Sequence, residues 1–447
     1  MLCLDVGSTY TKGALIDPDT AGLIDTCSVP TTLASDVWDG VTQVREEMAQ
    51  RWRHTPHLHD AAAVRICSSA GGGLRLAVVG FEHDVTALAG RAVALSAGAV
   101  VVHTTSGKLG ASDVTALSAA RPDVILLVGG TDGGNADTVL RNAGVLALAR
   151  LPAAVVVAGN RDAQEQACQI IADAGCPVIA AENVLPRIGT LSPTSARAAI
   201  RTAFLQHVIG GKHLSAGPHF AGAVRAATPD AVLDGIQVLR DVSEHDVMMI
   251  DIGGATTDVY SAVQPQGEDA TLRKDVVGTL WTARTVEGDL GMRHSAPGVL
   301  SAAHAEGITG TDDPHVRAWA EEVSRAPHRI ATTERERRND LRIATMAAVV
   351  AARRHARPAQ PSATPRPLMD VTSLIGSGGV LRYADPPQAL QVLAQVTGDV
   401  GGGWRPPERA RTRVDTAYLL CAIGLLAGEW PEVARGLARR LVPDVHA

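Results

Sequence analysis

The pattern of apolar and polar positions changes at about residue 63. Before it, strand-like runs follow one another closely at Leu2–Val6, Lys12–Asp17 and Leu23–Val29. Such close spacing predicts an antiparallel meander, because a parallel connection needs a crossover of about a dozen residues or more. After it, apolar runs such as RLAVVG and DVILLVGG alternate with helical segments. That alternation predicts a parallel sheet with helical crossovers, so we expect an inserted α/β subdomain from about residue 63 to about 190.

A second lobe is predicted beyond residue 190. Residues 191–245 have a helical, connecting pattern, and two strand-like runs follow at Val247–Asp251 and Thr257–Val263. We therefore expect an α/β protein with an N-terminal lobe at 1–190, which includes the insert, and a C-terminal lobe at 191–447.

Capping signals predict two helix starts in the second lobe. Asp313 precedes a proline, and Thr333 has a glutamate three residues later, which is the capping-box spacing. The Pro-rich stretch 353–367 is interpreted as a surface linker. An apolar helix, TAYLLCAIGLLAG, is expected near the end of the chain.

Composition narrows the class of protein. A chain of 447 residues is too long for one ordinary core, which favours two or three domains. A net charge of −6 and an aromatic content of 3% give neither a basic patch nor stacking platforms for nucleic acid. The six cysteines contain no CxxC pair, so a zinc site or a redox dithiol is not expected. The longest apolar run is too short to span a bilayer and no charged leader precedes the first strand, so we expect a cytoplasmic protein without membrane partners.

Two stretches share one design. MLCLDVGSTYTKGALID opens the chain, and MMIDIGGATTDVYS repeats it from residue 248. In each, an apolar strand ends in an aspartate, a glycine turn and hydroxyl side chains. The N–H groups of such a turn can bind phosphate oxygens, and the aspartate can hold Mg²⁺ through water. Two such hairpins in two lobes could hold a triphosphate from opposite sides, and the glycines of GSGG (376–379) would let backbone approach an adenine and a ribose.

Other phosphate-binding motifs do not match the sequence. At Gly211-Lys212, Gln206 stands where a P-loop has its first glycine, and His213 stands where it has a hydroxyl. No GxGxxG follows a predicted strand. Neither a P-loop NTPase nor a dinucleotide-binding protein is indicated.

The paired hairpins and the GSGG loop resemble the phosphate and adenosine loops of the superfamily of actin, sugar and acetate kinases and the ATPase domain of heat-shock chaperones. Four further stretches, SSAGGGLRLAVVGFEHDVTA, ILLVGGTDGGN, ENVLPRIG and RTVEGDLGMR, resemble the narrower glutamate mutase accessory family, whose members are often called MutL. This resemblance covers nearly the whole chain. It implies a two-lobed actin-like ATPase, with ribonuclease H-like lobes and the inserted α/β subdomain.

The resemblance also implies a function. Members of that family look like ATP-dependent, chaperone-like reactivating factors for an adenosylcobalamin-dependent mutase, such as glutamate (methylaspartate) mutase or a relative. They are thought to release damaged cobalamin and admit fresh cofactor. The implied cofactors are ATP and Mg²⁺, the implied partners are the mutase subunits, and the implied activity is a slow ATPase coupled to remodelling of the partner.

Site residues follow from the same resemblance. Asp5 and Asp251 would organise Mg²⁺ and the attacking water. The nucleotide would be contacted by Gly7, Ser8, Thr9, Lys12, Gly253, Gly254, Thr256, Thr257, Asp258, Glu287, Gly376, Gly378 and Gly379. Lys12 could equally face solvent, and Asp258 could equally cap its hairpin. Glu287, with Asp289, could line the cleft or form a turn. Asp132 and Asn135, which follow a predicted strand, are interpreted first as a capped turn and only second as ligand contacts.

Several alternative functions stay open. One is a small-molecule kinase of the same superfamily, although no further acid–base group over a substrate hydroxyl is evident. Another is a hydantoinase-type ATP-dependent amide hydrolase. An activator of dehydratases would carry an iron–sulfur cluster, which the scattered cysteines argue against. The last alternative is a scaffold protein that binds nucleotide but hydrolyses a negligible amount of it.

Overall fold

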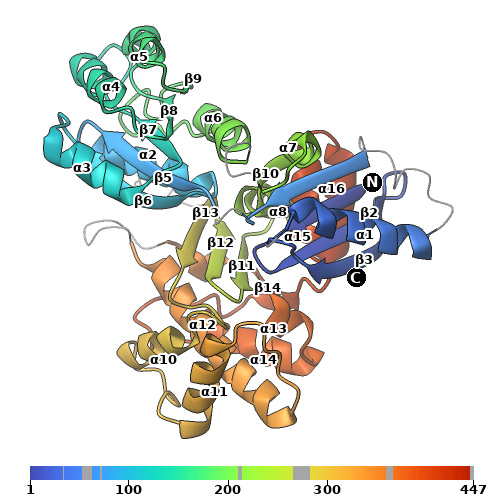
Figure 1. Cartoon of the computed structure of the whole chain (residues 1–447). Helices are drawn as coiled ribbons and strands as arrows, with labels where there is room; N and C mark the ends of the chain where they lie inside the picture. Colours follow the sequence, from blue (N-terminus) through green and yellow to red (C-terminus); the bar gives the residue numbers. More distant parts are fainter. Residues whose placement is uncertain are drawn as a thin grey trace. The chain divides into compact units, whose positions relative to one another are not determined.

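The structure is a computed structural model, and it describes residues 1–33, 35–52, 63–70, 73–209, 214–264, 282–358 and 366–442. The described chain divides into two compact units, and Figure 1 labels the helices and strands that form them. The first holds the described residues within 1–234 and 421–433, and the second those within 235–264, 282–420 and 434–442. Each unit therefore combines segments that are far apart in the sequence.

The first unit contains a five-stranded sheet in the order β10-β4-β1-β2-β3. Its strands are β1 (Leu2–Val6), β2 (Tyr10–Asp17), β3 (Gly22–Pro30), β4 (Val64–Ser68) and β10 (Val224–Ala227). The first three form the predicted antiparallel meander, and β4 and β10 extend the sheet in parallel on the other side of β1. Helix α1 (Val37–Arg51) packs its buried face on this meander, with Asp36 capping its start.

A second sheet of the first unit is parallel throughout, in the order β6-β5-β7-β8-β9. Its strands are β5 (Arg75–Gly80), β6 (Val100–Ser106), β7 (Val124–Leu127), β8 (Ala154–Val157) and β9 (Val178–Ala180). The crossover helices are α2 (Leu88–Ser96), α3 (Ala111–Ala120), α4 (Asp137–Ala149) and α5 (Arg161–Asp173), with the short element η3 (His83–Ala87) before α2. This sheet lies between β4 and β10 in the sequence, so it is an insertion into the first sheet.

The return from the insert to the first sheet is mainly helical, as predicted for 191–245. The return consists of α6 (Thr194–Ala203), η4 (Phe204–Ile209) and α7 (Pro218–Ala223), and α8 (Thr228–Ser243) follows β10. The helical prediction overlooked β10, because four residues are too short for a strand pattern to be recognised.

The second unit has its own five-stranded sheet, in the order β13-β12-β11-β14-β15. The strands are β11 (Val247–Ile252), β12 (Thr257–Ala262), β13 (Thr282–Glu287), β14 (Ser373–Ser377) and β15 (Arg411–Val414). Its helices are α10 (Ala296–Ala305), α11 (Pro314–Arg325), α12 (Glu334–Ala356), α13 (Gly379–Arg382) and α14 (Pro386–Thr397), with η5 (Leu368–Asp370) before β14. Two more helices, α15 (Leu419–Ala427) and α16 (Pro431–Leu441), end the described chain.

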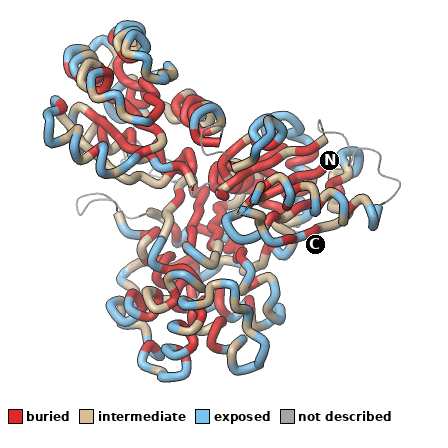
Figure 2. The backbone as a smooth tube through the Cα atoms, in the orientation of Figure 1, coloured by how far each residue is buried: buried red, intermediate tan, exposed pale blue. Residues whose placement is uncertain are grey.

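The two five-stranded sheets have one topology. In each, three consecutive antiparallel strands are followed by two strands that add in parallel beside the first. The central strands β1 and β11 are almost completely buried, and Figure 2 shows the strands of the sheets mostly in the buried class. The prediction of an α/β protein with two ribonuclease H-like lobes and an inserted α/β subdomain is confirmed.

The boundaries of the parts differ from those expected at 63 and 190. Residues 64–68 form β4, which pairs with β1, so the inserted sheet begins only at β5. The first compact unit continues to residue 234, because β10 returns to the first sheet after the insert. These pairings join residues about 60 to 160 positions apart, and local sequence patterns carry no information on such distant pairing.

Helix α12 extends further than expected. Its start at Thr333 has the predicted capping box with Glu336. It continues to Ala356, however, so the expected linker at 353–367 begins inside a helix, with Arg353 and His355 buried. Residues 359–365 of that stretch lie outside the described residues. Among the helices that the structure describes, none is long and apolar enough to cross a membrane.

The buried side chain of His355 predicts acid sensitivity of the second unit. Its Nε2 lies 2.8 Å from the Ser261 hydroxyl and its Nδ1 lies 3.0 Å from the Thr285 hydroxyl. Burial, together with the nearby Arg366 guanidinium, holds the pKa of His355 well below its usual 6.5. Protons therefore bind the unfolded state preferentially below about pH 6.5, and the free energy of unfolding should fall by about 1.4 kcal/mol per pH unit there.

Urea denaturation of the whole protein between pH 7.5 and 5 would measure this loss. We expect the slope to flatten in His355→Gln, which cannot be protonated. The exposed His315, replaced in the same way, serves as the control. If the free energy of unfolding fell equally with pH in the wild type and in His355→Gln, His355 would not be the source of the acid sensitivity.

Candidate functional site

The first predicted phosphate loop is the turn between β1 and β2. The Gly7 N–H donates to the Tyr10 carbonyl at 3.0 Å, which closes the turn. A Cβ atom at Gly7 would lie 2.9 Å from that carbonyl oxygen, so glycine is required here. Ser8 and Thr9 are exposed at the tip, so their hydroxyls and backbone are open to a ligand.

Asp5 lies at the end of β1 and is held by two neighbours. The Thr228 hydroxyl donates to its Oδ1 at 2.6 Å, and the Lys12 ammonium lies 3.3 Å from its Oδ2. Lys12 is the register partner of Asp5 on β2. The Lys12 ammonium is therefore directed at Asp5, and its predicted contact with phosphate stays a prediction.

The turn between β11 and β12 repeats this geometry in the second unit. The Gly253 N–H donates to the Thr256 carbonyl at 2.9 Å, the counterpart of the Gly7–Tyr10 bond. A Cβ at Gly253 would again lie 2.9 Å from that carbonyl oxygen. Asp251 pairs in register with Asp258, as Asp5 does with Lys12. The shared design seen in the sequence is therefore a shared backbone structure.

Asp258 is engaged in a buried ion pair. The Arg284 guanidinium donates to its Oδ1 at 2.7 Å, and the Thr256 hydroxyl donates to its Oδ2 at 3.0 Å. Burial by itself would lower the pKa of Arg284, but the interactions with Asp258 and Tyr260 together outweigh burial, and that pKa is raised. Asp258 thus stabilises the hairpin through bonds to Arg284 and Thr256. The hydroxyl of the buried Thr257 donates to the Leu290 carbonyl at 2.7 Å.

The GSGG loop lies against the second turn within the same unit. Ser377, at the end of β14, is the register partner of Asp251, and its hydroxyl is buried without a hydrogen-bond partner among the described residues. Gly378 has a φ of +100°, and a Cβ there would lie 2.1 Å from the Ile252 carbonyl oxygen. Gly376 packs against leucine side chains, and Gly379 has open space at its Cβ position. Only glycine at 378 allows this loop to approach the end of β11.

The stretch RTVEGDLGMR supports the second turn from another side. The N–H groups of Met292 and Arg293 donate to the carbonyls of Gly253 and Gly254, at 3.0 and 2.8 Å. A Cβ at Gly291 would lie 2.3 Å from the Ala255 carbonyl oxygen. These supporting residues were not identified as site residues from the sequence. The glycines of this stretch could have indicated them, because a glycine often marks a close approach of two backbone segments.

Glu287 lies beside the second turn but already has a cationic partner. It is the register neighbour of Thr257, and its carboxylate lies 2.7 Å from the Arg354 guanidinium, which also binds Asp289. Burial raises the pKa of Glu287 although Arg354 opposes that change.

Asp132 and Asn135 of the inserted sheet form a capped turn, as the preferred interpretation stated. Asn135 Oδ1 accepts the Thr138 N–H at 3.1 Å, near the start of α4. Asp132 Oδ1 accepts the Arg161 N–H and the Asn183 side-chain amide, at 3.0 and 2.9 Å. Both side chains therefore have hydrogen-bond partners within the protein.

Known proteins resemble this chain along its full length. The family described as "MutL protein" matches residues 1–442. A curated relative, Protein MutL of Clostridium tetanomorphum, is 32% identical over 470 residues, and the match covers 99% of each chain.

Among solved structures, the activator of the 2-hydroxyisocaproyl-CoA dehydratase from Clostridium difficile with bound ADPNP is 11% identical, with 100% of each chain covered and a TM-score of 0.32. The ROK hexokinase from Thermus thermophilus is also 11% identical, with a TM-score of 0.28 and coverage of 97% of this chain and 98% of that chain. TM-scores this low do not support a fold assignment, which rests instead on the strand order described above. The full-length match and the 32% identity show that the chain, with its two ribonuclease H-like lobes, belongs to the MutL protein family.

Proposed function

We propose that this protein is an ATP-dependent, chaperone-like reactivating factor for an adenosylcobalamin-dependent mutase, of the glutamate mutase type or a relative. The observation that supports this most strongly is the repeated strand–turn–strand unit with an aspartate at the strand end, in a chain of the MutL family. Nucleotide binding and slow hydrolysis would drive release of damaged cobalamin and entry of fresh cofactor.

Each repeated turn, taken by itself, has groups that could contact a magnesium nucleotide. The glycines at 7, 253 and 378 bring backbone within reach of a ligand without a Cβ in the way, and the Ser377 hydroxyl is buried and unpartnered among the described residues. Asp5 and Asp251 supply the carboxylate oxygens that Mg²⁺ prefers. The candidate residues of the nucleotide site are Gly7, Ser8, Thr9, Lys12, Gly253, Gly254, Thr256, Thr257, Asp258, Glu287, Gly376, Gly378 and Gly379.

Bound Mg²⁺ would neutralise phosphate charge, and the chain's own groups have separate tasks. Thr228 and Lys12 hold the Asp5 carboxylate in one orientation, which lowers the cost of ordering it when ligand binds. The turn N–H groups at Ser8, Thr9 and Gly254 would donate to phosphate oxygens. Lys12, Asp258 and Glu287 act in this proposal through their neighbours, because each already has a charged partner.

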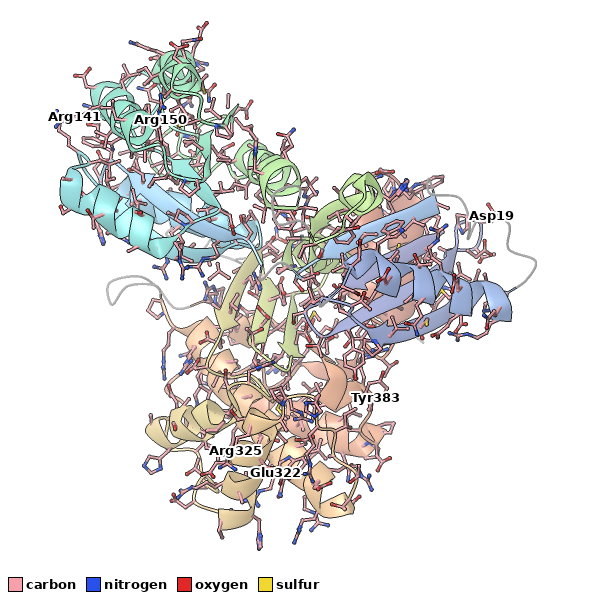
Figure 3. All side chains as sticks on the ribbon, in the orientation of Figure 1. Asp19, Arg141, Arg150, Glu322, Arg325 and Tyr383 are labelled. Carbon is pink, nitrogen blue, oxygen red and sulfur yellow. The ribbon has the colours of Figure 1, made fainter. Side chains whose placement is uncertain are left out.

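Reactivation of a mutase tests the proposal. A glutamate mutase inactivated by damaged cobalamin is mixed with this protein, Mg-ATP and fresh adenosylcobalamin, and recovery of mutase activity is measured. We expect recovery to require ATP and to be at least ~100-fold slower with Asp251→Ala, since loss of one preorganised polar group that stabilises a transition state costs about 10²–10³ in rate. Asp19→Ala, an exposed aspartate labelled in Figure 3, is the matched control and should leave recovery unchanged.

The remaining outcomes separate the alternatives. ATP binding without recovery would indicate a different mutase as the client. ATP turnover that depends on a small metabolite instead of a protein would support the kinase or amide-hydrolase alternative, and would overturn the proposal.

A further inference from the structure

Three side chains that could coordinate a metal converge at the end of β1 in the first unit. They are Asp5, Cys67 and Cys421, all buried, and their candidate ligand atoms lie within 4.8 Å of one another. The two sulfur atoms are 3.0 Å apart, and Cys67 Sγ is 3.8 Å from Asp5 Oδ1. Within the described residues this is the one such cluster of three or more histidine, cysteine, aspartate or glutamate side chains.

The fold holds these residues together from three separate segments. Asp5 and Cys67 are register partners on the adjacent parallel strands β1 and β4, so their side chains lie on the same face of the sheet. Cys421 comes from α15. The Arg65 guanidinium, two residues before Cys67 on β4, binds Glu429 at 2.5 Å and fixes this end of the chain against the same strand.

The donor atoms suit a borderline-soft divalent cation. Two thiolates and one carboxylate oxygen are ligands that Zn²⁺ accepts, whereas Mg²⁺ takes oxygen ligands and avoids sulfur. Bond lengths of about 2.3 Å to sulfur and about 2.0 Å to oxygen in a tetrahedral site place sulfur about 3.5 Å from oxygen and the two sulfurs about 3.8 Å apart. The observed sulfur–oxygen separation of 3.8 Å is already close, and the sulfurs at 3.0 Å would need to move apart by less than an ångström.

Neighbouring groups provide the rest of such a site. Two thiolates and a carboxylate carry one negative charge more than a divalent cation neutralises, and the Lys12 ammonium lies 3.3 Å from Asp5 Oδ2. The Thr228 hydroxyl donates to Asp5 Oδ1 at 2.6 Å, the kind of outer bond that orients a carboxylate ligand. Three protein ligands leave a fourth position for water or for an oxygen of a bound molecule.

We propose that Asp5, Cys67 and Cys421 form a binding site for a single divalent cation of the Zn²⁺ class, with an open fourth position. A disulfide between the two cysteines would use the sulfurs alone, whereas a cation uses all three groups. If the proposed function also holds, Zn²⁺ at this site occupies the carboxylate that would organise Mg²⁺, and it would inhibit the nucleotide reaction.

Metal binding is measured on the full-length protein without nucleotide, so its outcome does not depend on the proposed function. Protein freed of metal under reducing conditions is titrated with Co²⁺ in excess Mg²⁺, and thiolate-to-cobalt absorption is recorded. Displacement of the cobalt by Zn²⁺ then gives the zinc affinity. We expect one Co²⁺ per chain with tetrahedral thiolate absorption, and loss of this absorption in Cys67→Ser and Cys421→Ser.

The control is Cys168→Ser, a half-buried cysteine on α5 of the inserted sheet, which should bind cobalt like the wild type. Thermal unfolding without metal shows which variants fold, and Zn²⁺ should raise the unfolding temperature of the wild type and of Cys168→Ser alone. If Cys67→Ser does not fold, Cys421→Ser on the helix provides the same test.

Three results would overturn the proposal. The first is absence of tight Co²⁺ or Zn²⁺ binding by the wild type. The second is binding that survives both Cys67→Ser and Cys421→Ser. The third is an as-isolated protein whose Cys67 and Cys421 peptides are joined in a disulfide and which binds no metal after reduction.

Discussion

Replacement of Arg284 by alanine is expected to lower the free energy of unfolding of the second unit by about 3–5 kcal/mol. The guanidinium and the Asp258 carboxylate are both buried, and they are 2.7 Å apart between β13 and β12. Without Arg284, the carboxylate would remain buried, and the Thr256 hydroxyl would be its one hydrogen-bond partner among the described residues. An uncompensated buried charge costs far more than the pair itself contributes, which is the source of the large effect.

Urea denaturation monitored by tryptophan fluorescence would measure this loss. The matched control is Arg317→Ala, because Arg317 pairs with Asp312 on the surface, where the two side chains are 56% and 81% exposed. That change should shift stability by less than about 1 kcal/mol. The double variant Arg284→Met with Asp258→Asn should recover much of the loss, since it leaves no buried charge. If Arg284→Ala were as stable as Arg317→Ala, the Asp258 carboxylate would not be a buried charge that depends on Arg284.

Replacement of Gly378 by alanine is expected to weaken nucleotide binding by at least ~10-fold, which corresponds to about 1.4 kcal/mol. The residue has a φ of +100°, which costs a non-glycine residue about 1–3 kcal/mol. Its new Cβ would also lie 2.1 Å from the Ile252 carbonyl oxygen, so the GSGG loop must move away from the end of β11. That movement separates the loop from the second turn, where the nucleotide contacts are proposed.

Titration calorimetry with Mg-ATP and a non-hydrolysable analogue would measure the affinity. Gly401→Ala is the control, because a Cβ at Gly401 meets nothing within 4 Å and its φ is not in the left-handed region. Unchanged affinity in a folded Gly378→Ala variant would place the nucleotide away from this loop, and it would leave the fold assignment intact.

Local patterns predicted the elements on which both candidate loops are built. The apolar runs before Asp5 and Asp251 are β1 and β11, and the glycine turns after them close with equivalent hydrogen bonds. Asp313 and Thr333 cap α11 and α12 as predicted, since a capping side chain binds backbone within three residues of itself. In each case the determining interactions are short in sequence.

The sequence by itself therefore determined the fold class, the repeated hairpins and the family, because periodicity, turn chemistry and characteristic stretches are local properties of a chain. Tertiary structure alone decided which side chains meet. Strand pairing placed Cys67 beside Asp5, α15 brought Cys421 to both, and Gly378 came against Ile252. These partners are separated by roughly 60 to 420 residues, and a periodic pattern shows which face is buried but not what that face will pack against.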